Sequence, residues 1–195
     1  DMTTASKTVH NHLVYYDSEH EHRRLEVVGP KRARMVLDGG QYSADNFTVT
    51  LATAGTITGD ATLVGGGFVI TPGAVEDQGV QAQQLGEAFY LSGAYPAYFG
   101  IRFAMLDADQ TDFVAGLCIT DTTLLGGMTD GVYFRKVDGS TDVKLVLEKN
   151  STETESAAIA TAADATDMVL EFVFDGANID SWVNGVQQTR LAQTN

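Results

Sequence analysis

The feature that most constrains this fold is a two-residue alternation of apolar side chains, which recurs in several short runs. Residues 99–105 and 168–174 show it most clearly, and residues 113–119 and 143–147 repeat it. A period of two places alternate side chains on opposite faces of an extended strand. The pattern therefore predicts β-strands that turn one face toward a core. Shorter strand-like runs at 47–51, 61–64 and 68–71 are broken by glycine.

Turn residues between these runs predict how the strands pair. Asp138-Gly139, Asp175-Gly176 and Asn184-Gly185 each separate two apolar runs, and Asn-Gly is the preferred pair for a tight two-residue hairpin. Three hairpin signals in the last 60 residues predict an antiparallel meander, and short strands of this spacing form two packed sheets. We therefore expect an all-β fold, a two-sheet antiparallel β-sandwich or jelly roll.

Charge and composition exclude several classes of function. The 195 residues carry a formal net charge of −14, and 44% of them are hydrophobic. Such a charge repels nucleic acid and anionic membranes, so neither is an expected partner. The hydrophobic content is sufficient for a core, and no apolar run reaches the roughly 18 residues of a membrane-spanning helix. A single cysteine, Cys118, allows no internal disulfide and favours folding in a reducing cytoplasm.

The first 34 residues differ from the rest of the chain. They hold six basic and five acidic residues and all four histidines, whereas residues 35–195 hold six basic and 21 acidic residues. We therefore predict an extended N-terminal arm at 1–34 and a β-sandwich domain at 35–195. The arm residues with the chemistry to bind an acidic partner surface are His10, His12, His20, His22, Arg23, Arg24, Lys31, Arg32 and Arg34. A solvated tail, and metal chelation by the two histidine pairs, are the alternatives.

Two segments resemble known families. The run Leu170–Val186, in which an apolar strand ending in Asp175-Gly176 precedes a strand ending in Asn184-Gly185, resembles the late strands of concanavalin A-like, laminin-G-like β-sandwiches. The run Phe99–Arg135 is similar to virion structural proteins of tailed bacteriophages, in particular head-decoration proteins. The resemblance implies a non-enzymatic protein that decorates or cements the capsid surface, without a cofactor.

The implied role sets the expected location and partners. The protein would be made in the host cytoplasm and reside on the virion. Its partners would be the major capsid protein and sister subunits, in a homo-oligomer for which a trimer at a three-fold of the shell is the expected state. The alternative is a carbohydrate-binding, lectin-like module of a virion or tail fibre, in which aromatic side chains would stack against sugars. The aromatic candidates are Trp182, Tyr90, Tyr95, Tyr98 and Tyr133.

Enzymatic and metal-binding functions have weaker support. A glycoside hydrolase is the third hypothesis, but the spaced carboxylates of a sugar cleft are absent, since Glu171 is isolated and Asp175 lies in a turn. Calcium takes oxygen ligands, and the candidates for it are Asp107, Asp109 and Asp112, between two strands. The alternative for this segment is a loop in which aspartates cap their own backbone turns.

Overall fold

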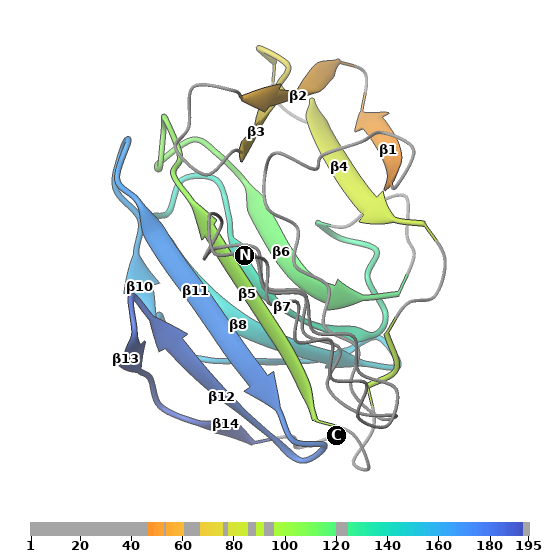
Figure 1. The fold of residues 1–195 in the computed structure, drawn as a ribbon, viewed down its shortest axis with the longest axis vertical. Coiled ribbons are helices and arrows are strands. Elements are labelled where there is room, and N and C mark those ends of the chain that lie inside the picture. The colour runs from red at the N-terminus through yellow and green to blue at the C-terminus, as the bar shows by residue number, and fades with distance from the viewer. Residues whose placement is uncertain are drawn as a thin grey trace, which may run out of the picture. The chain divides into compact units, whose positions relative to one another are not determined.

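A computed structural model describes residues 47–52, 54–60, 67–75, 78–85, 89–91, 96–119 and 125–192. The chain divides into two compact units, residues 1–82 and 83–195. Strands make up the regular structure of the described residues (Figure 1). Within these ranges there is no helix of the length and apolarity needed to cross a membrane.

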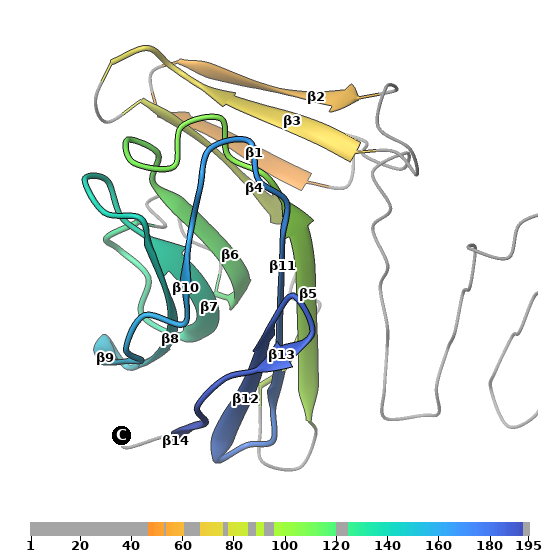
Figure 2. The ribbon, with the colours of Figure 1, turned by 90° about the vertical axis from the view of Figure 1, so that its left-hand side faces the viewer.

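The second unit holds two five-stranded antiparallel sheets. In one sheet β6 (Phe113–Cys118), β7 (Gly131–Lys136) and β8 (Asp142–Lys149) lie side by side, and β9 (Thr152–Glu155) and β10 (Ala160–Thr161) both pair with β8. In the other sheet β5 (Ala97–Phe103) pairs with β11 (Met168–Phe174), which pairs with β12 (Asn178–Val183). The short strands β13 (Val186–Gln187) and β14 (Leu191–Ala192) pair with β12. Figure 2 shows these sheets as two facing layers.

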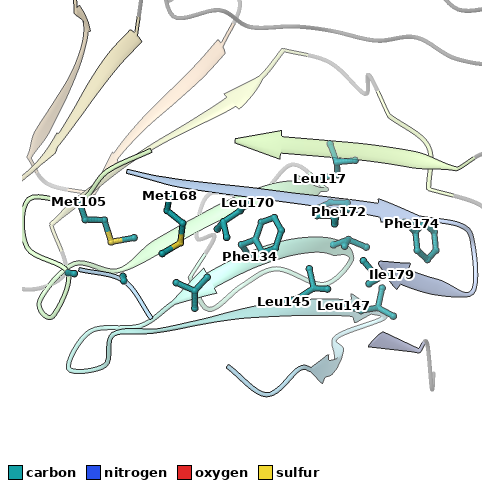
Figure 3. Close-up of a cluster of buried hydrophobic side chains, with 14 residues drawn as sticks. Met105, Leu117, Phe134, Leu145, Leu147, Met168, Leu170, Phe172, Phe174 and Ile179 are labelled. Atoms are coloured by element: carbon teal, nitrogen blue, oxygen red, sulfur yellow. The ribbon is translucent and has the colours of Figure 1, made fainter. Parts of the chain in front are cut away.

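The core lies between the two sheets. Strand β11 alternates buried and half-buried residues along its whole length, as its period of two predicts. Phe172 occupies the centre, with its ring centroid 5.5 Å from that of Phe99 on β5 and 5.6 Å from that of Phe134 on the opposing sheet. Further buried side chains from both sheets surround it (Figure 3): Leu117, Val132, Val143, Leu145, Leu147, Met168, Leu170, Phe174 and Ile179.

The predicted hairpins form where their turn residues lie. Asn184 and Gly185 both have positive φ, at 50° and 79°, and join β12 to β13 with Val183 opposite Val186. This is the backbone that a two-residue hairpin of matching twist requires. Asp175-Gly176 joins β11 to β12, and Asp138-Gly139 lies between β7 and β8. The three hairpins are shared between the two sheets and do not form one meander.

The earlier strands form two-stranded sheets, which lie in the first unit except for residues 83 and 84. Strand β1 (Phe47–Ala52) pairs with β4 (Gly79–Gln84), and β2 (Gly55–Asp60) forms an antiparallel ribbon with β3 (Gly67–Pro72). The strand-like runs at 47–51 and 68–71 are therefore strands, whereas 61–64 lies outside the described residues. For the described residues the all-β prediction is confirmed, and the paired antiparallel sheets are consistent with a β-sandwich. The predicted boundary at residue 34 lies outside the described residues.

One core position predicts a stabilising substitution. Ser181 on β12 is fully buried opposite Phe172 on β11, and its hydroxyl has no hydrogen-bond partner among the described residues. Because a buried unpaired hydroxyl is costly, Ser181→Ala should raise the free energy of unfolding by about 1 kcal/mol. The matched control is Ser156→Ala, since the Ser156 hydroxyl accepts a hydrogen bond from the Leu145 amide and donates one to the Ala157 carbonyl. Urea unfolding should show opposite signs for the two variants, and a destabilised Ser181→Ala protein would contradict the prediction.

Candidate functional site

The arm residues singled out in the sequence lie outside the described residues. They are His10, His12, His20, His22, Arg23, Arg24, Lys31, Arg32 and Arg34. Partner binding by the arm therefore stays a prediction.

In the Asp-rich loop before β6, carboxylates bond to backbone amides. One oxygen of Asp107 accepts hydrogen bonds from the amides of Asp109 and Gln110, at 3.2 and 3.0 Å. Asp112 accepts one from the amide of Asp138, at 2.7 Å, which ties the loop to the β7–β8 turn. Asp164 accepts one from the amide of Ala108 at 2.8 Å. Asp107 thus caps its own backbone turn, as in the alternative to calcium binding, whereas Asp112 and Asp164 bond the amides of segments distant in the sequence.

A buried ammonium group supports the same loop. Lys136 ends β7 on the core side, is completely buried, and donates hydrogen bonds to the carbonyls of Asp109 and Thr111 at 2.9 and 2.5 Å. The carbonyl of Asp109 also accepts from the amide of Gly139. Across the described ranges, no three carboxylate, histidine or cysteine side chains gather as a metal site. Calcium binding by Asp107, Asp109 and Asp112 remains a prediction without support from this geometry.

A charged network covers the outer face of the β7–β8–β9 sheet. Arg135 bonds both carboxylate oxygens of Glu153, at 2.7 and 2.6 Å, and also contacts Glu155. Lys144 donates to the other oxygen of Glu155 at 2.5 Å. Burial alone would raise the pKa of Glu155, but the hydrogen bonds from Lys144 and Arg135 outweigh it and hold that pKa below its ordinary value. The network therefore favours the charged form of Glu155, and both Glu153 and Glu155 are paired with cationic side chains.

A small cavity lies beside this network. It has a volume of about 60 Å³, and its lining includes Met128, Tyr133, Arg135 and Glu148. The Tyr133 hydroxyl donates to Glu148 at 2.8 Å, and burial, followed by that hydrogen bond, raises the pKa of Tyr133 well above its usual range. The phenol thus stays neutral, and the space has room for little more than water.

The outer face of the other sheet carries an exposed aromatic group. On strands β5, β11 and β12, Gly100, Glu171 and Trp182 lie opposite one another in register. Tyr98, two residues before Gly100, leans over that glycine and donates from its hydroxyl to Glu171 at 2.7 Å. The side chain of Tyr98 is 53% exposed, and Trp182 is half-buried. We call Tyr98, Glu171, Trp182 and Gln187, which lies opposite Trp182 on β13, the aromatic platform.

The other aromatic candidates do not join this platform. Tyr133 lies on the outer face of the opposing sheet and is buried, and Tyr95 lies outside the described residues. Tyr90 is 79% exposed in the segment before β5. Sequence reasoning missed the role of Glu171 and Gly100, because only the strand register brings them together with Tyr98.

The β2–β3 ribbon exposes apolar side chains. Val69 and Ile70 on β3 are 41% and 43% exposed, and Phe68 beside them is 39% exposed. Ile70 pairs with Ile57 on one face, while Val69 pairs with Thr58 on the other. The ribbon therefore presents apolar surface in two directions, which is uncommon for a strand pair that faces only water.

Compared with known proteins, the chain matches no protein-family model and no curated protein sequence.

Proposed function

We propose that this protein is a non-enzymatic virion structural protein of a tailed phage, which decorates or cements the capsid surface. Two sequence segments support the proposal through their resemblance to phage head-decoration proteins and to concanavalin A-like sandwiches. The paired antiparallel sheets of residues 97–192 agree with that fold type. The finer expectation, a jelly roll with an extended arm at 1–34, belongs to the same proposal.

The exposed β2–β3 ribbon is the observation that carries the proposal. A two-stranded ribbon is marginally stable in water, and exposed strands with apolar side chains favour contact with another protein. Val69 and Ile70 point to opposite faces of the ribbon, so a partner could pack against either face or along the edge of β3. We assign this contact to the capsid shell.

The basic arm would supply the second contact. Its arginines and lysines complement the acidic body of a sister subunit, which carries 21 acidic and six basic residues from residue 35 onward. Stabilisation would then follow from mass action, because a ligand that binds only the assembled lattice raises the resistance of that lattice to heat. Copies around a symmetry axis of the shell would form the expected homo-oligomer.

Particle composition tests the proposal directly. Intact virions, isolated heads and isolated tails would be analysed by quantitative mass spectrometry for this chain. We expect many copies on heads, and we expect heads without the protein to lose their genome at a lower temperature. Absence from particles, or confinement to tails, would contradict capsid decoration.

The ribbon gives a sharper test. The double variant Val69→Ser, Ile70→Ser should weaken binding to heads that lack the protein by about tenfold or more, because it removes exposed apolar contact area. Val186→Ser is the matched control, since Val186 is 65% exposed on β13 and should leave head binding unchanged. Co-sedimentation with purified heads measures both. Equal binding by the two variants would exclude the ribbon as the docking element.

A further inference from the structure

The turn between β12 and β13 holds the only Asn-Gly pair of the chain, Asn184-Gly185. Both residues are exposed and have positive φ. In such a pair the backbone nitrogen of the glycine can attack the side-chain carbonyl carbon of the asparagine, because glycine has no side chain that hinders the approach. No described atom lies within 4 Å of where a Cβ atom of residue 185 would be, so the turn has space to rearrange.

Hydrogen bonds around this turn favour the attack. The side-chain oxygen Oδ1 of Asn184 accepts a bond from the amide of Val169 on β11, at 2.8 Å. A donor at this distance stabilises the negative charge that develops on Oδ1 when the carbon beside it is attacked. Within the part of the chain that the structure describes, the Gly185 amide, which is the nucleophile, has no hydrogen-bond acceptor. The electrophile is therefore polarised while the nucleophile is available.

Two other turns have their nucleophile occupied. Asn150-Ser151, between β8 and β9, also has positive φ at both residues, but the Ser151 amide donates to the Thr129 carbonyl at 2.9 Å. In the Asp138-Gly139 turn, the glycine amide donates to the Asp109 carbonyl at 2.9 Å. Each of these bonds must break before the nitrogen can attack the neighbouring side chain. We therefore expect both turns to react slowly in the folded protein.

The Asp175-Gly176 turn is protected at its carboxyl group. One oxygen of Asp175 accepts hydrogen bonds from the amides of Ala177 and Asn178, at 2.9 and 2.7 Å. These bonds hold the pKa of the Asp175 carboxyl below its ordinary value, so the group stays ionised at neutral pH. A carboxylate is attacked by an amide nitrogen far less readily than a neutral side-chain amide is. This turn should therefore persist as well.

We propose that Asn184 is a site of spontaneous deamidation in the folded protein, where its conversion to isoaspartate opens the β12–β13 hairpin. The Gly185 nitrogen forms a bond to Cγ of Asn184 and loses its proton. The bond from Cγ to Nδ2 breaks, and Nδ2 takes up a proton and leaves as ammonia, so that a succinimide ring remains. Water then opens the ring at either carbonyl carbon, which gives aspartate or isoaspartate. The reaction consumes one water molecule, releases one ammonia molecule and needs no oxidant or reductant.

Isoaspartate changes the hairpin because its main chain runs through the former side-chain carbon. The turn thereby gains a backbone atom, and the oxygen that accepted a bond from Val169 becomes part of the main chain or of a displaced carboxylate. A tight hairpin with Val183 opposite Val186 cannot absorb this atom, since loop length fixes hairpin register. Strand β13 should then separate from β12. The inference concerns this turn alone and does not depend on capsid decoration.

Ageing of the full chain at neutral pH, both folded and in guanidinium chloride, tests the proposal. Peptide mapping by mass spectrometry, with isoaspartate methyltransferase labelling, measures the conversion at each site over time. In the folded chain Asn184 should convert first, at a rate within about threefold of its rate in denaturant. Folding should slow conversion at Asn150, Asp138 and Asp175 by about tenfold or more. Equal protection of Asn184 by folding, or earlier conversion at one of the other three sites, would overturn the proposal.

A matched variant separates the structural effect from residue type. Ser151→Gly places an Asn-Gly pair in the β8–β9 turn, where the amide of residue 151 still faces the Thr129 carbonyl. In the folded variant Asn150 should convert about tenfold more slowly than Asn184, although both are followed by glycine. Equal rates at the two turns would show that the Asn-Gly pair alone determines the site, and would contradict the proposed role of the hydrogen bonds.

Hydrogen exchange measures whether the hairpin opens. In aged wild-type protein the amides of β13 should exchange faster than in fresh protein, in proportion to the isoaspartate content. Gly185→Ala should convert about tenfold more slowly, because its methyl group hinders the approach of the nitrogen to Cγ, and its exchange should not change on ageing. Asn184→Asp carries the aspartate product and should keep the hairpin, since its carboxylate can still accept from Val169. Unchanged exchange in protein that contains isoaspartate would contradict opening of the hairpin.

Discussion

Phe172→Ala is expected to lower the free energy of unfolding by about 3–5 kcal/mol, which is the cost of removing a large aromatic side chain from a packed core. Phe172 is fully buried and contacts the rings of Phe99 and Phe134, so its removal loosens contacts within its own sheet and across the core. Side chains from rigid antiparallel strands cannot collapse fully into the space that is left. The cost should therefore exceed the transfer free energy of the ring alone.

Urea unfolding followed by Trp182 fluorescence measures this effect in the unit that contains the core. Phe89→Ala is the matched control, because Phe89 belongs to the same unit but is 46% exposed. The control should change the free energy of unfolding by less than about 1 kcal/mol. Similar losses for Phe172→Ala and Phe89→Ala would contradict the placement of the core between the two sheets.

The strands and turns around this core are predictable from the sequence because their signals are local. Residues 168–174 form β11 with the bounds that the alternation predicts, and Asn184-Gly185 forms the tight turn that its residue types favour. Both results depend on interactions within a few residues. The division of the three hairpins between two sheets is not local, and no turn residue specifies it.

Strand β9 shows where periodicity fails. Its sequence, Thr152–Glu155, contains no apolar residue, so alternation gives no signal. The strand is held by pairing with β8 and by the ion pairs of Glu153 and Glu155 with Arg135 and Lys144. Cross-strand charge pairs of this kind depend on the register, which is fixed only after the neighbouring strands are in place.

The same limit applies to the candidate sites. Trp182 and Tyr98 were identifiable as aromatic candidates from residue type, but Glu171 was interpreted as an isolated carboxylate. Glu171 accepts a hydrogen bond from Tyr98, which is 73 residues away in the sequence, and lies opposite Trp182, which is more than ten residues away. Both contacts arise only when the strands pair. Likewise, Asp107, Asp109 and Asp112 were the calcium candidates, whereas the contact of that loop with the ammonium of Lys136, 25 residues beyond Thr111, had no signal in the sequence.

Lys136→Ala is expected to lower the free energy of unfolding by about 2–4 kcal/mol, through lost packing of the buried stem and lost hydrogen bonds from a charged donor. The ammonium bonds the carbonyls of Asp109 and Thr111, so without it two acceptors at the end of the core lose a partner. The loop would remain tied to the β7–β8 turn by the bond from the Gly139 amide to Asp109 and by Asp112. We therefore expect a destabilised but folded protein.

Lys136→Met separates the two contributions. Methionine keeps most of the apolar stem and carries no charge. The free energy of unfolding of this variant should fall by about 1–2 kcal/mol, because the loss of the hydrogen bonds is partly offset by removing the cost of burying a charge. Urea unfolding of both variants, combined with the rate of proteolytic cleavage within residues 107–112, measures stability and local opening together. Cleavage should accelerate in both variants, because the carbonyl contacts that hold the loop are lost in both. A Lys136→Met protein with wild-type stability and wild-type cleavage would show that the buried ammonium does not hold the loop, and that the turn-capping aspartates are sufficient for its conformation.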